Sequence, residues 1–277
     1  ENSSNFIFDI IDAALAEAVE SDGRPTIIVG KTKIGFGAPN KQGKASAHGE
    51  PLGDEEIKLA KENLGWPYPD TTFYVPEEVK AHVAEINAAG AKAEADWNEM
   101  FKAYAEKYPE LAKEYAVWHS DELPVDLLAD EDFWKDEGDI ATRATSEKVL
   151  QKAAKAVPNL FGGSADLAPS NLTYIKEGGD YSAENRAGRN LHFGVREHAM
   201  AAICNAIALH GGLRVFCGTF FVFSDYMKHS MRMSAIMKLP VTYVLTHDSI
   251  GVGEDGATHE PIEHLAGLRA TPDLLVL

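Results

Sequence analysis

The segment 246–259 holds the densest group of residues in this sequence that could do acid–base chemistry. It follows an apolar run and contains His247, Asp255 and His259 among several glycines. Imidazoles bind anionic oxygens and exchange protons near neutral pH, and glycines let the backbone approach a ligand closely. This composition indicates a binding or catalytic loop. A surface loop with incidental histidines stays open as an alternative, as does a metal site, although the spacing matches none of the standard zinc patterns.

A carboxylate and a row of aromatic residues lie in two earlier segments. Glu197 stands where an apolar strand gives way to a helix, and Phe220, Phe223 and Tyr226 follow the next strand at spacings of three. The spacing predicts one aromatic wall on one side of a helical turn. A glutamate in a first turn is favoured by the helix dipole whatever the function, and aromatic triplets usually belong to a core. Neither feature alone identifies a site.

Three further residues could contact an anion or a ring. Asp166 lies in a turn of small residues over 162–171, and Arg143 lies at a predicted helix start. A guanidinium matches the geometry of phosphate oxygens. His48 lies in the glycine-rich loop 33–53, and long loops are often functional. An ordinary surface role remains open for each of these residues.

The elements that must position these residues alternate after Thr142. Apolar spacing predicts helices over 146–156, 197–209, 223–237 and 261–268, and strands over 159–161, 191–195, 213–217, 241–245 and 274–277. Such alternation predicts an α/β fold, a parallel sheet flanked by helices on both faces. Ligands bind at the carboxyl ends of the strands in these sheets. The segments selected on this basis are 162–171, 194–198, 218–226 and 246–259.

The first half of the chain is predicted to be less regular. A helix over 6–19 precedes a short β-branched strand over 26–29, and the loop 33–53 follows. Further helices are predicted over 54–63 and over 76–107, the second of them long. The acidic stretch 121–139 has the character of an interdomain connection.

Composition limits the possible functions. The 277 residues are 45% hydrophobic and carry a formal charge of -17, which disfavours nucleic acid and anionic membranes as partners. Cys204 and Cys217 lie in apolar segments, so we expect two buried thiols in a reducing compartment. Every apolar run is shorter than the roughly 20 residues of a membrane span, and we expect a cytoplasmic protein.

Five segments, taken together and in order, closely resemble transketolase: 32–37 with His48-Gly49, 162–171, 194–200, 218–226 and 246–261. The resemblance covers essentially the whole chain. It implies a thiamine-diphosphate enzyme of the pentose phosphate pathway, which moves a two-carbon ketol unit from a ketose phosphate to an aldose phosphate. It also implies a homodimer with the active site between subunits. The implied domains are the end of the diphosphate-binding domain over 1–75, a helical connection over 76–140 and the pyrimidine-binding domain over 141–277.

The resemblance also assigns roles to individual residues. Glu197 resembles the carboxylate that hydrogen-bonds the aminopyrimidine ring and stabilises its imino tautomer, which then removes the thiazolium C2 proton; the cofactor acts as an electron sink. The other implied cofactor contacts are Asp166, Ile34, His48, Phe220, Phe223 and Tyr226. His48, His247 and His259 are the implied acid–base residues beside the reacting carbons and the phosphate. The implied substrate contacts are Arg143, Ser170, His247, Asp255 and His259.

The sequence departs from the family pattern in one motif and at its ends. Family members bind the diphosphate through Mg²⁺ or Ca²⁺ held by a Gly-Asp-Gly motif, which is absent here, so we expect no metal ligand in this chain. The chain begins at Glu1 rather than Met and ends on the predicted strand 274–277. We therefore expect a truncated sequence that is inactive alone.

Other functions remain open at this point. Dihydroxyacetone synthase or another ketol-transferring relative is one alternative, and a deoxyxylulose-phosphate synthase fits less well. From a different class, the chain could be a noncatalytic or split-enzyme subunit that contributes the pyrimidine pocket to another chain. Preferred sugar phosphates are not encoded in any of these patterns.

Overall fold

The chain divides into two compact units, Glu1–Ala93 and Glu94–Leu277. The computed structural model describes residues 3–20, 23–123, 125–127, 129–135 and 138–277. The boundary between the units falls within the long helix α3 (Glu77–Lys107). The bounds of α3 confirm the predicted helix over 76–107. No helix in the described part of the chain is long and apolar enough to cross a membrane.

The N-terminal unit contains α1 (Ser3–Val19), the 3-10 turn η1 (Ala45–Ala47), α2 (Asp54–Asn63) and the start of α3. The buried Glu56 carboxylate of α2 accepts from the Asn40 backbone N–H at 2.7 Å, from the Asn40 amide at 2.8 Å and from the Lys41 N–H at 3.2 Å. The Asn40 side chain is the main reason that the pKa of Glu56 lies below its ordinary value. These bonds hold the predicted loop 33–53 against α2.

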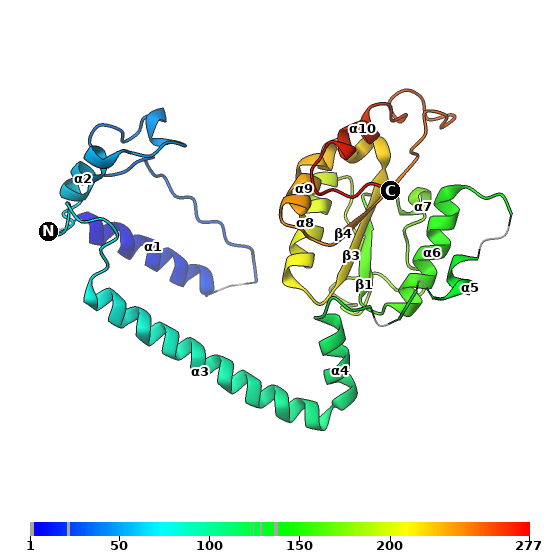
Figure 1. Ribbon diagram of the computed structural model, residues 1–277, viewed down its shortest axis with the longest axis horizontal. Coiled ribbons are helices and arrows are strands. Elements are labelled where there is room, and N and C mark those ends of the chain that lie inside the picture. Colours follow the sequence, from blue (N-terminus) through cyan, green and yellow to red (C-terminus); the bar gives the residue numbers. More distant parts are fainter. Residues whose placement is uncertain (1–2, 21–22, 124, 128, 136–137) are drawn as a thin grey trace. The chain divides into compact units, whose positions relative to one another are not determined.

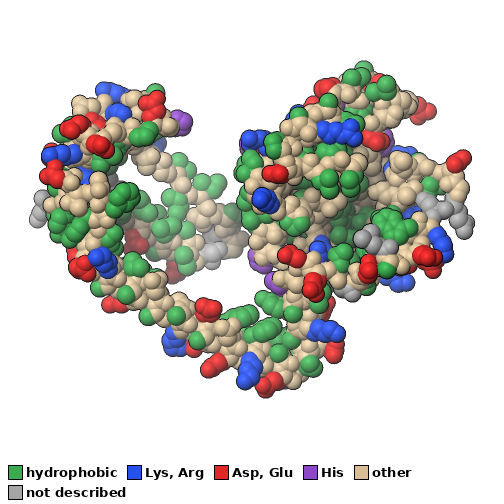
Figure 2. Space-filling view, in the orientation of Figure 1, with side chains coloured by type: hydrophobic (Ala, Val, Ile, Leu, Met, Phe, Trp, Pro, Cys, Tyr) green, Lys and Arg blue, Asp and Glu red, His purple; other side chains and the backbone are tan. Residues whose placement is uncertain are grey.

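The predicted strand over 26–29 is wrong. These residues are extended but unpaired, and Ile27 and Val29 are 85% and 81% exposed. A strand is stable only when its backbone groups pair with a neighbour. No second strand occurs among the described residues of this unit. Figure 2 shows many hydrophobic side chains at the surface of the unit.

The C-terminal unit is built on a four-stranded parallel sheet in the order β2-β1-β3-β4 (Figure 1). The strands are β1 (Leu160–Ser164), β2 (Asn190–His192), β3 (Arg214–Phe220) and β4 (Val241–Thr246). The helices are α4 (Pro109–Trp118), α5 (Glu131–Trp134), α6 (Thr142–Ala156), α7 (Ala168–Asn171), α8 (Glu197–His210), η2 (Phe221–Phe223), α9 (Ser224–Ile236) and α10 (His264–Arg269). The predicted α/β fold is confirmed.

Alternation along β3 divides the core between the two faces of the sheet. Val215 and Cys217 point toward the α8 and α9 side, whereas Phe216 packs with Ala154 of α6 and with Ile175. Figure 1 shows α8 and α9 on one side of the sheet and α6 and α7 on the other. A hydrogen bond from the Cys217 thiol to Cys204, and next burial, raise the pKa of Cys217. Both thiols are free and buried, as predicted.

The predicted strand over 274–277 is also wrong. Leu274 and Val276 pack against the core on the α8 and α9 side, but no ladder joins them to β4. Asp273 has a φ of +61°, which turns the backbone away from an extended path just before these residues. Pro272 lacks an N–H that a ladder could use. The segment is therefore held by the packing of its side chains and by a backbone hydrogen bond from the Leu274 N–H to the Thr271 carbonyl, not by strand pairing.

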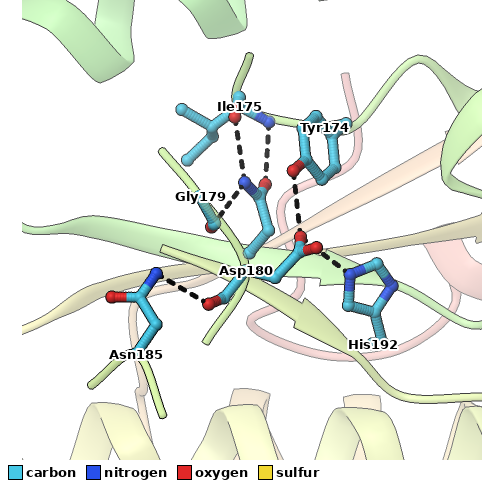
Figure 3. A network of polar contacts seen from close by, with 7 residues as sticks. Tyr174, Ile175, Gly179, Asp180, Asn185 and His192 are labelled. Carbon is cyan, nitrogen blue, oxygen red and sulfur yellow. Dashed lines mark hydrogen bonds and ion pairs between the residues drawn. The ribbon is translucent and has the colours of Figure 1, made fainter. Parts of the chain in front are cut away.

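The edge strand β2 is fixed by polar groups in the loop before it. The buried Asn190 side chain accepts from the Ile175 N–H at 2.8 Å and donates to the Ile175 carbonyl at 2.9 Å. The Asp180 carboxylate accepts from the Tyr174 hydroxyl and from His192 Nε2, both at 2.9 Å (Figure 3). The bond from His192, and next the bond from Tyr174, lower the pKa of Asp180. The position of β2 also sets where α8 begins.

The acidic stretch 121–139 contains the short helix α5, whose Phe133 is buried. The Lys152 ammonium donates to the Phe133 carbonyl at 2.6 Å and to the Asp132 carbonyl at 2.7 Å. Residues 124, 128, 136 and 137 lie outside the described residues. The described part of the stretch is therefore tied to α6 and is not a free linker.

Replacement of Phe216 by Ala tests this account of the core. The side chain is 2% exposed, so we expect the free energy of unfolding to fall by about 3–5 kcal/mol, measured by urea titration. Ile236→Ala is the control, because Ile236 is 54% exposed and its loss should cost less than about 0.5 kcal/mol. Equal losses in the two variants would contradict the assigned core.

Candidate active site

The carboxyl ends of the four strands meet at one edge of the sheet, because all four are parallel. Asp166 follows β1, Glu197 follows β2, Phe220 ends β3 and His247 follows β4. Only β3 among these strands leads directly into a helical turn, η2 (Phe221–Phe223). The edge predicted from the alternation of elements is therefore the edge where the candidate side chains gather.

The aromatic residues form a continuous row along this edge. Ring centroids are 5.8 Å apart for Phe220 and Phe223 and 6.1 Å apart for Phe223 and Tyr226. His247 lies 3.8 Å from Phe220, and His259 lies 5.3 Å from Phe223. The row spans a strand end, a 3-10 turn and the helix α9, so the predicted single helical turn is wrong in detail. The row nevertheless joins the end of β3 to the histidine loop.

Arg143 and His247 line a cavity of about 580 Å³, whose other charged lining residues are Asp248, Glu254 and Asp255. Arg143 is the second residue of α6, as predicted. Its Nη1 lies 3.2 Å from His247 Nε2 and 3.4 Å from the Ser170 carbonyl oxygen. A guanidinium and an imidazole on one wall of an open cavity suit an oxyanion.

Burial, and next the charge of Arg143, lower the pKa of His247 below its ordinary value of 6.5. His259 acts in the same direction, whereas Asp255 and Asp248 raise the pKa. The backbone of His247 is left-handed, with a φ of +57°, an uncommon conformation for a residue with a side chain. The unliganded site therefore holds an imidazole that resists protonation.

Glu197 is a largely buried residue whose carboxylate oxygens are not fully enclosed. It is the first residue of α8 and is 8% exposed. The helix N-terminus favours its negative charge. Within the described ranges, no side chain or backbone N–H hydrogen-bonds the carboxylate. The carboxylate is therefore free to accept a hydrogen bond, and a protonated ring nitrogen of a bound cofactor would fit as the donor.

The remaining predicted site residues are exposed. Asp166 is exposed in a left-handed conformation, with a φ of +62°, just beyond β1. His48 and Ile34 are exposed residues of the N-terminal unit, so their place at the site stays a prediction. The structure adds a buried group that sequence reasoning missed: Ser164, Asn171 and Thr246. The sequence feature that could have indicated this group is a small polar residue at the end of an apolar strand or short helix.

A parallel sheet that presents a lone buried carboxylate, an aromatic row and an Arg–His pair at one edge has the features of a thiamine-diphosphate-binding α/β fold. Comparison with family models agrees. The model for the transketolase pyrimidine binding domain matches residues 138–277, and the model for the transketolase thiamine diphosphate binding domain matches residues 2–124. The chain belongs to the transketolase family. The exact domain ranges 1–75, 76–140 and 141–277 stay a prediction.

Individual relatives are similar along nearly the whole chain. A transketolase from Geobacillus stearothermophilus is 54% identical over 96% of this chain and 40% of its own length, and a chloroplastic transketolase from Zea mays is 48% identical over 99% and 41%. A crystal structure of transketolase from Pichia stipitis in complex with sedoheptulose-7-phosphate has a TM-score of 0.84 at 42% identity, covering 94% of this chain and 39% of that one. The chain thus spans about two fifths of the length of these relatives.

The lowered pKa of His247 makes a prediction about pH. The unfolded chain binds a proton at His247 at higher pH than the folded chain, so this residue's contribution to stability is complete above pH 6.5 and is lost as the pH falls below it. We expect Arg143→Met to raise the pKa of His247 and to weaken this acid-induced loss. Histidine NMR titration and urea titrations between about pH 5 and pH 7 measure both effects. An unchanged His247 pKa in Arg143→Met would contradict the assigned contact.

Proposed function

We propose that this chain is part of a transketolase, which transfers a two-carbon ketol unit from a ketose phosphate to an aldose phosphate with thiamine diphosphate as cofactor. The observation that carries the proposal is the position of Glu197, a largely buried residue whose carboxylate has no hydrogen-bond partner among the described residues and lies at the ligand-binding edge of the sheet. Family membership and the names of the relatives support it. The relatives are longer, so we further propose that turnover needs the remaining length.

Glu197, the aromatic row and Asp166 are the proposed holders of the pyrimidine half of the cofactor. The carboxylate would accept a hydrogen bond from a ring N–H and keep the proton on that nitrogen. Phe220, Phe223 and Tyr226 would pack against the ring and exclude water from it. Thiamine diphosphate supplies an electron sink for carbon–carbon bond cleavage. His48 and Ile34 are the proposed cofactor contacts from the N-terminal unit. A Mg²⁺ ion would bind the diphosphate through residues other than those named here.

The proposed binding site for the phosphate group of the sugar consists of Arg143, His247 and Ser170. Arg143 and His247 would supply the donors for an anion in a chain with a net charge of -17, and the carboxylates of Asp248, Glu254 and Asp255 line other parts of the same cavity. Asp255 would accept from a donor hydroxyl. His259, in contact with Phe223, would exchange protons with the hydroxyl groups beside the reacting carbons, and His48 would assist it.

The proposed assembly is a homodimer. Val195, Ile203 and Leu209, in and beside α8, are apolar residues that are 74%, 46% and 58% exposed. A second copy that covers these side chains would also close the cofactor site. The free thiols Cys204 and Cys217 support a reducing compartment, and we propose the cytoplasm.

Replacement of Glu197 by Gln tests the carboxylate. In the protein at the full length of its relatives, we expect kcat to fall by about 10²–10⁴-fold, because the amide cannot stabilise the ring proton. A coupled assay with ketose and aldose phosphates measures turnover. Glu177→Gln is the matched control, because Glu177 is exposed in a loop away from the edge, and it should keep full activity. Full activity of Glu197→Gln would sink the proposal.

Replacement of Arg143 by Met tests the phosphate subsite. We expect KM for a ketose phosphate to rise by roughly 10–100-fold, because a hydrogen bond to a charged group is worth about 1.5–3 kcal/mol. KM for an unphosphorylated ketose should not change. Arg186→Met removes an exposed arginine that contacts Tyr181, and serves as the control. Equal effects on both substrates would show that Arg143 acts on something other than phosphate.

A further inference from the structure

A chain of buried polar side chains runs behind the His247 ring. It contains Thr246 at the end of β4, Asn171 at the end of α7 and Ser164 at the end of β1, which are 7%, 0% and 3% exposed. Thr246 Oγ1 lies 2.9 Å from His247 Nδ1 and 2.8 Å from Asn171 Oδ1. Asn171 Nδ2 lies 2.7 Å from Ser164 Oγ. Three separate elements therefore meet in one hydrogen-bonded line that ends on the imidazole.

The direction of each hydrogen in this line follows from its inner end. The Gly218 carbonyl can only accept, so the Ser164 hydroxyl donates to it at 2.8 Å. Ser164 Oγ then accepts from the Asn171 amide, which leaves Asn171 Oδ1 to accept from the Thr246 hydroxyl. The single proton of Thr246 is thereby used. Thr246 Oγ1 can only accept from the neighbouring ring, so His247 Nδ1 carries a proton.

The contact between Arg143 and His247, at the cavity end of the line, independently indicates that Nδ1 carries the proton. Arg143 Nη1 has only hydrogens to offer, and it lies 3.2 Å from His247 Nε2. Nε2 must therefore present its lone pair. The opposite arrangement would need the Asn171 amide turned over, a Thr246 hydroxyl that donates to Nδ1, and a proton on Nε2 facing the guanidinium N–H. Two donors would then oppose each other.

We infer that Ser164, Asn171 and Thr246 are positioning residues that lock neutral His247 as the Nδ1-protonated tautomer, so that His247 can donate to a sugar phosphate only after Nε2 takes up a proton from solvent. This inference rests on the proposed role of His247 as a phosphate ligand. No covalent bond breaks in the step: a proton leaves solvent, an N–H bond forms at Nε2, and the imidazolium faces the phosphate. The Arg143 guanidinium turns from Nε2 to the same anion.

The charged groups around the His247 imidazole fit a coupling between phosphate binding and proton uptake. Arg143 from α6 and His259 from the histidine loop disfavour the charged ring, whereas Asp248 and Asp255 from that loop favour it. Burial and Arg143 keep the pKa of His247 low, so the ring is neutral in the empty site. A phosphate would add negative charge beside the ring and raise that pKa. Phosphate binding therefore brings its own proton uptake.

The test uses histidine nitrogen NMR on this chain with ¹⁵N-labelled histidine, because nitrogen shifts separate the two neutral tautomers from the imidazolium. His247→Gln assigns the signals of His247. At neutral pH we expect the Nδ1–H tautomer in the wild-type chain and in Thr246→Ser, which keeps the hydroxyl. Thr246→Val should lose it in favour of Nε2–H or a mixture. Should Thr246→Val not fold, the wild-type spectrum and the Thr246→Ser spectrum decide alone.

Addition of inorganic phosphate to the wild-type chain tests the second half. We expect the His247 signals to move to those of the imidazolium. Nε2–H, or an even mixture, in the wild-type chain without phosphate would overturn the tautomer lock whatever phosphate does. A phosphate-bound ring that stays neutral would overturn the proton uptake and leave the phosphate site intact. If the His247 signals do not change when phosphate is added, the proposed phosphate role and the proton uptake are both wrong. The tautomer measured without phosphate still tests the tautomer lock separately.

Discussion

The parallel pairing of β1 with β3, and of β3 with β4, is the constraint on which the rest of the C-terminal unit depends. Phe220 pairs with Thr246, so β3 and β4 end at the same level, and Ser164 pairs with Gly218, so β1 ends two residues earlier along β3. The chain then turns sharply at each end, and residues more than one hundred positions apart come into contact, as Arg143 and His247 do. A shift of one residue in register would send alternate side chains to the opposite face of the sheet. The site exists because the register is fixed.

Polar groups buried at this edge are the second determinant. Inside a protein a charge or a hydroxyl needs a partner. Asn171 and Thr246 find partners within the chain, whereas the Glu197 carboxylate finds none in the described structure. The hydrogen bonds of Asn171 and Thr246 stiffen the wall of the cavity, whereas the Glu197 carboxylate stays available to a ligand. This division explains how one edge can be rigid and still open to binding.

Much of the fold was predictable from the sequence, because apolar periodicity reports burial directly. The helices on both faces, the strands β1 to β4 and the edge that carries Arg143, Glu197 and His247 all followed from it. The strands at 26–29 and 274–277 did not form, since β-branched or apolar composition cannot supply a pairing neighbour. The line from Ser164 to Thr246 was invisible for a related reason: its hydrogen bonds join β1, α7 and β4, and sequence spacing holds no information on such contacts.

The central claim is that the Glu197 carboxylate governs proton transfer at a bound thiamine diphosphate. The most direct measurement is the rate at which the C2 proton of that cofactor exchanges with deuterium from solvent, followed by NMR after rapid quenching, in the full-length protein and its Glu197→Gln variant. The account predicts that both proteins bind the cofactor and that the variant exchanges the proton at least about 100-fold more slowly. Equal exchange rates in two proteins saturated with cofactor would contradict it.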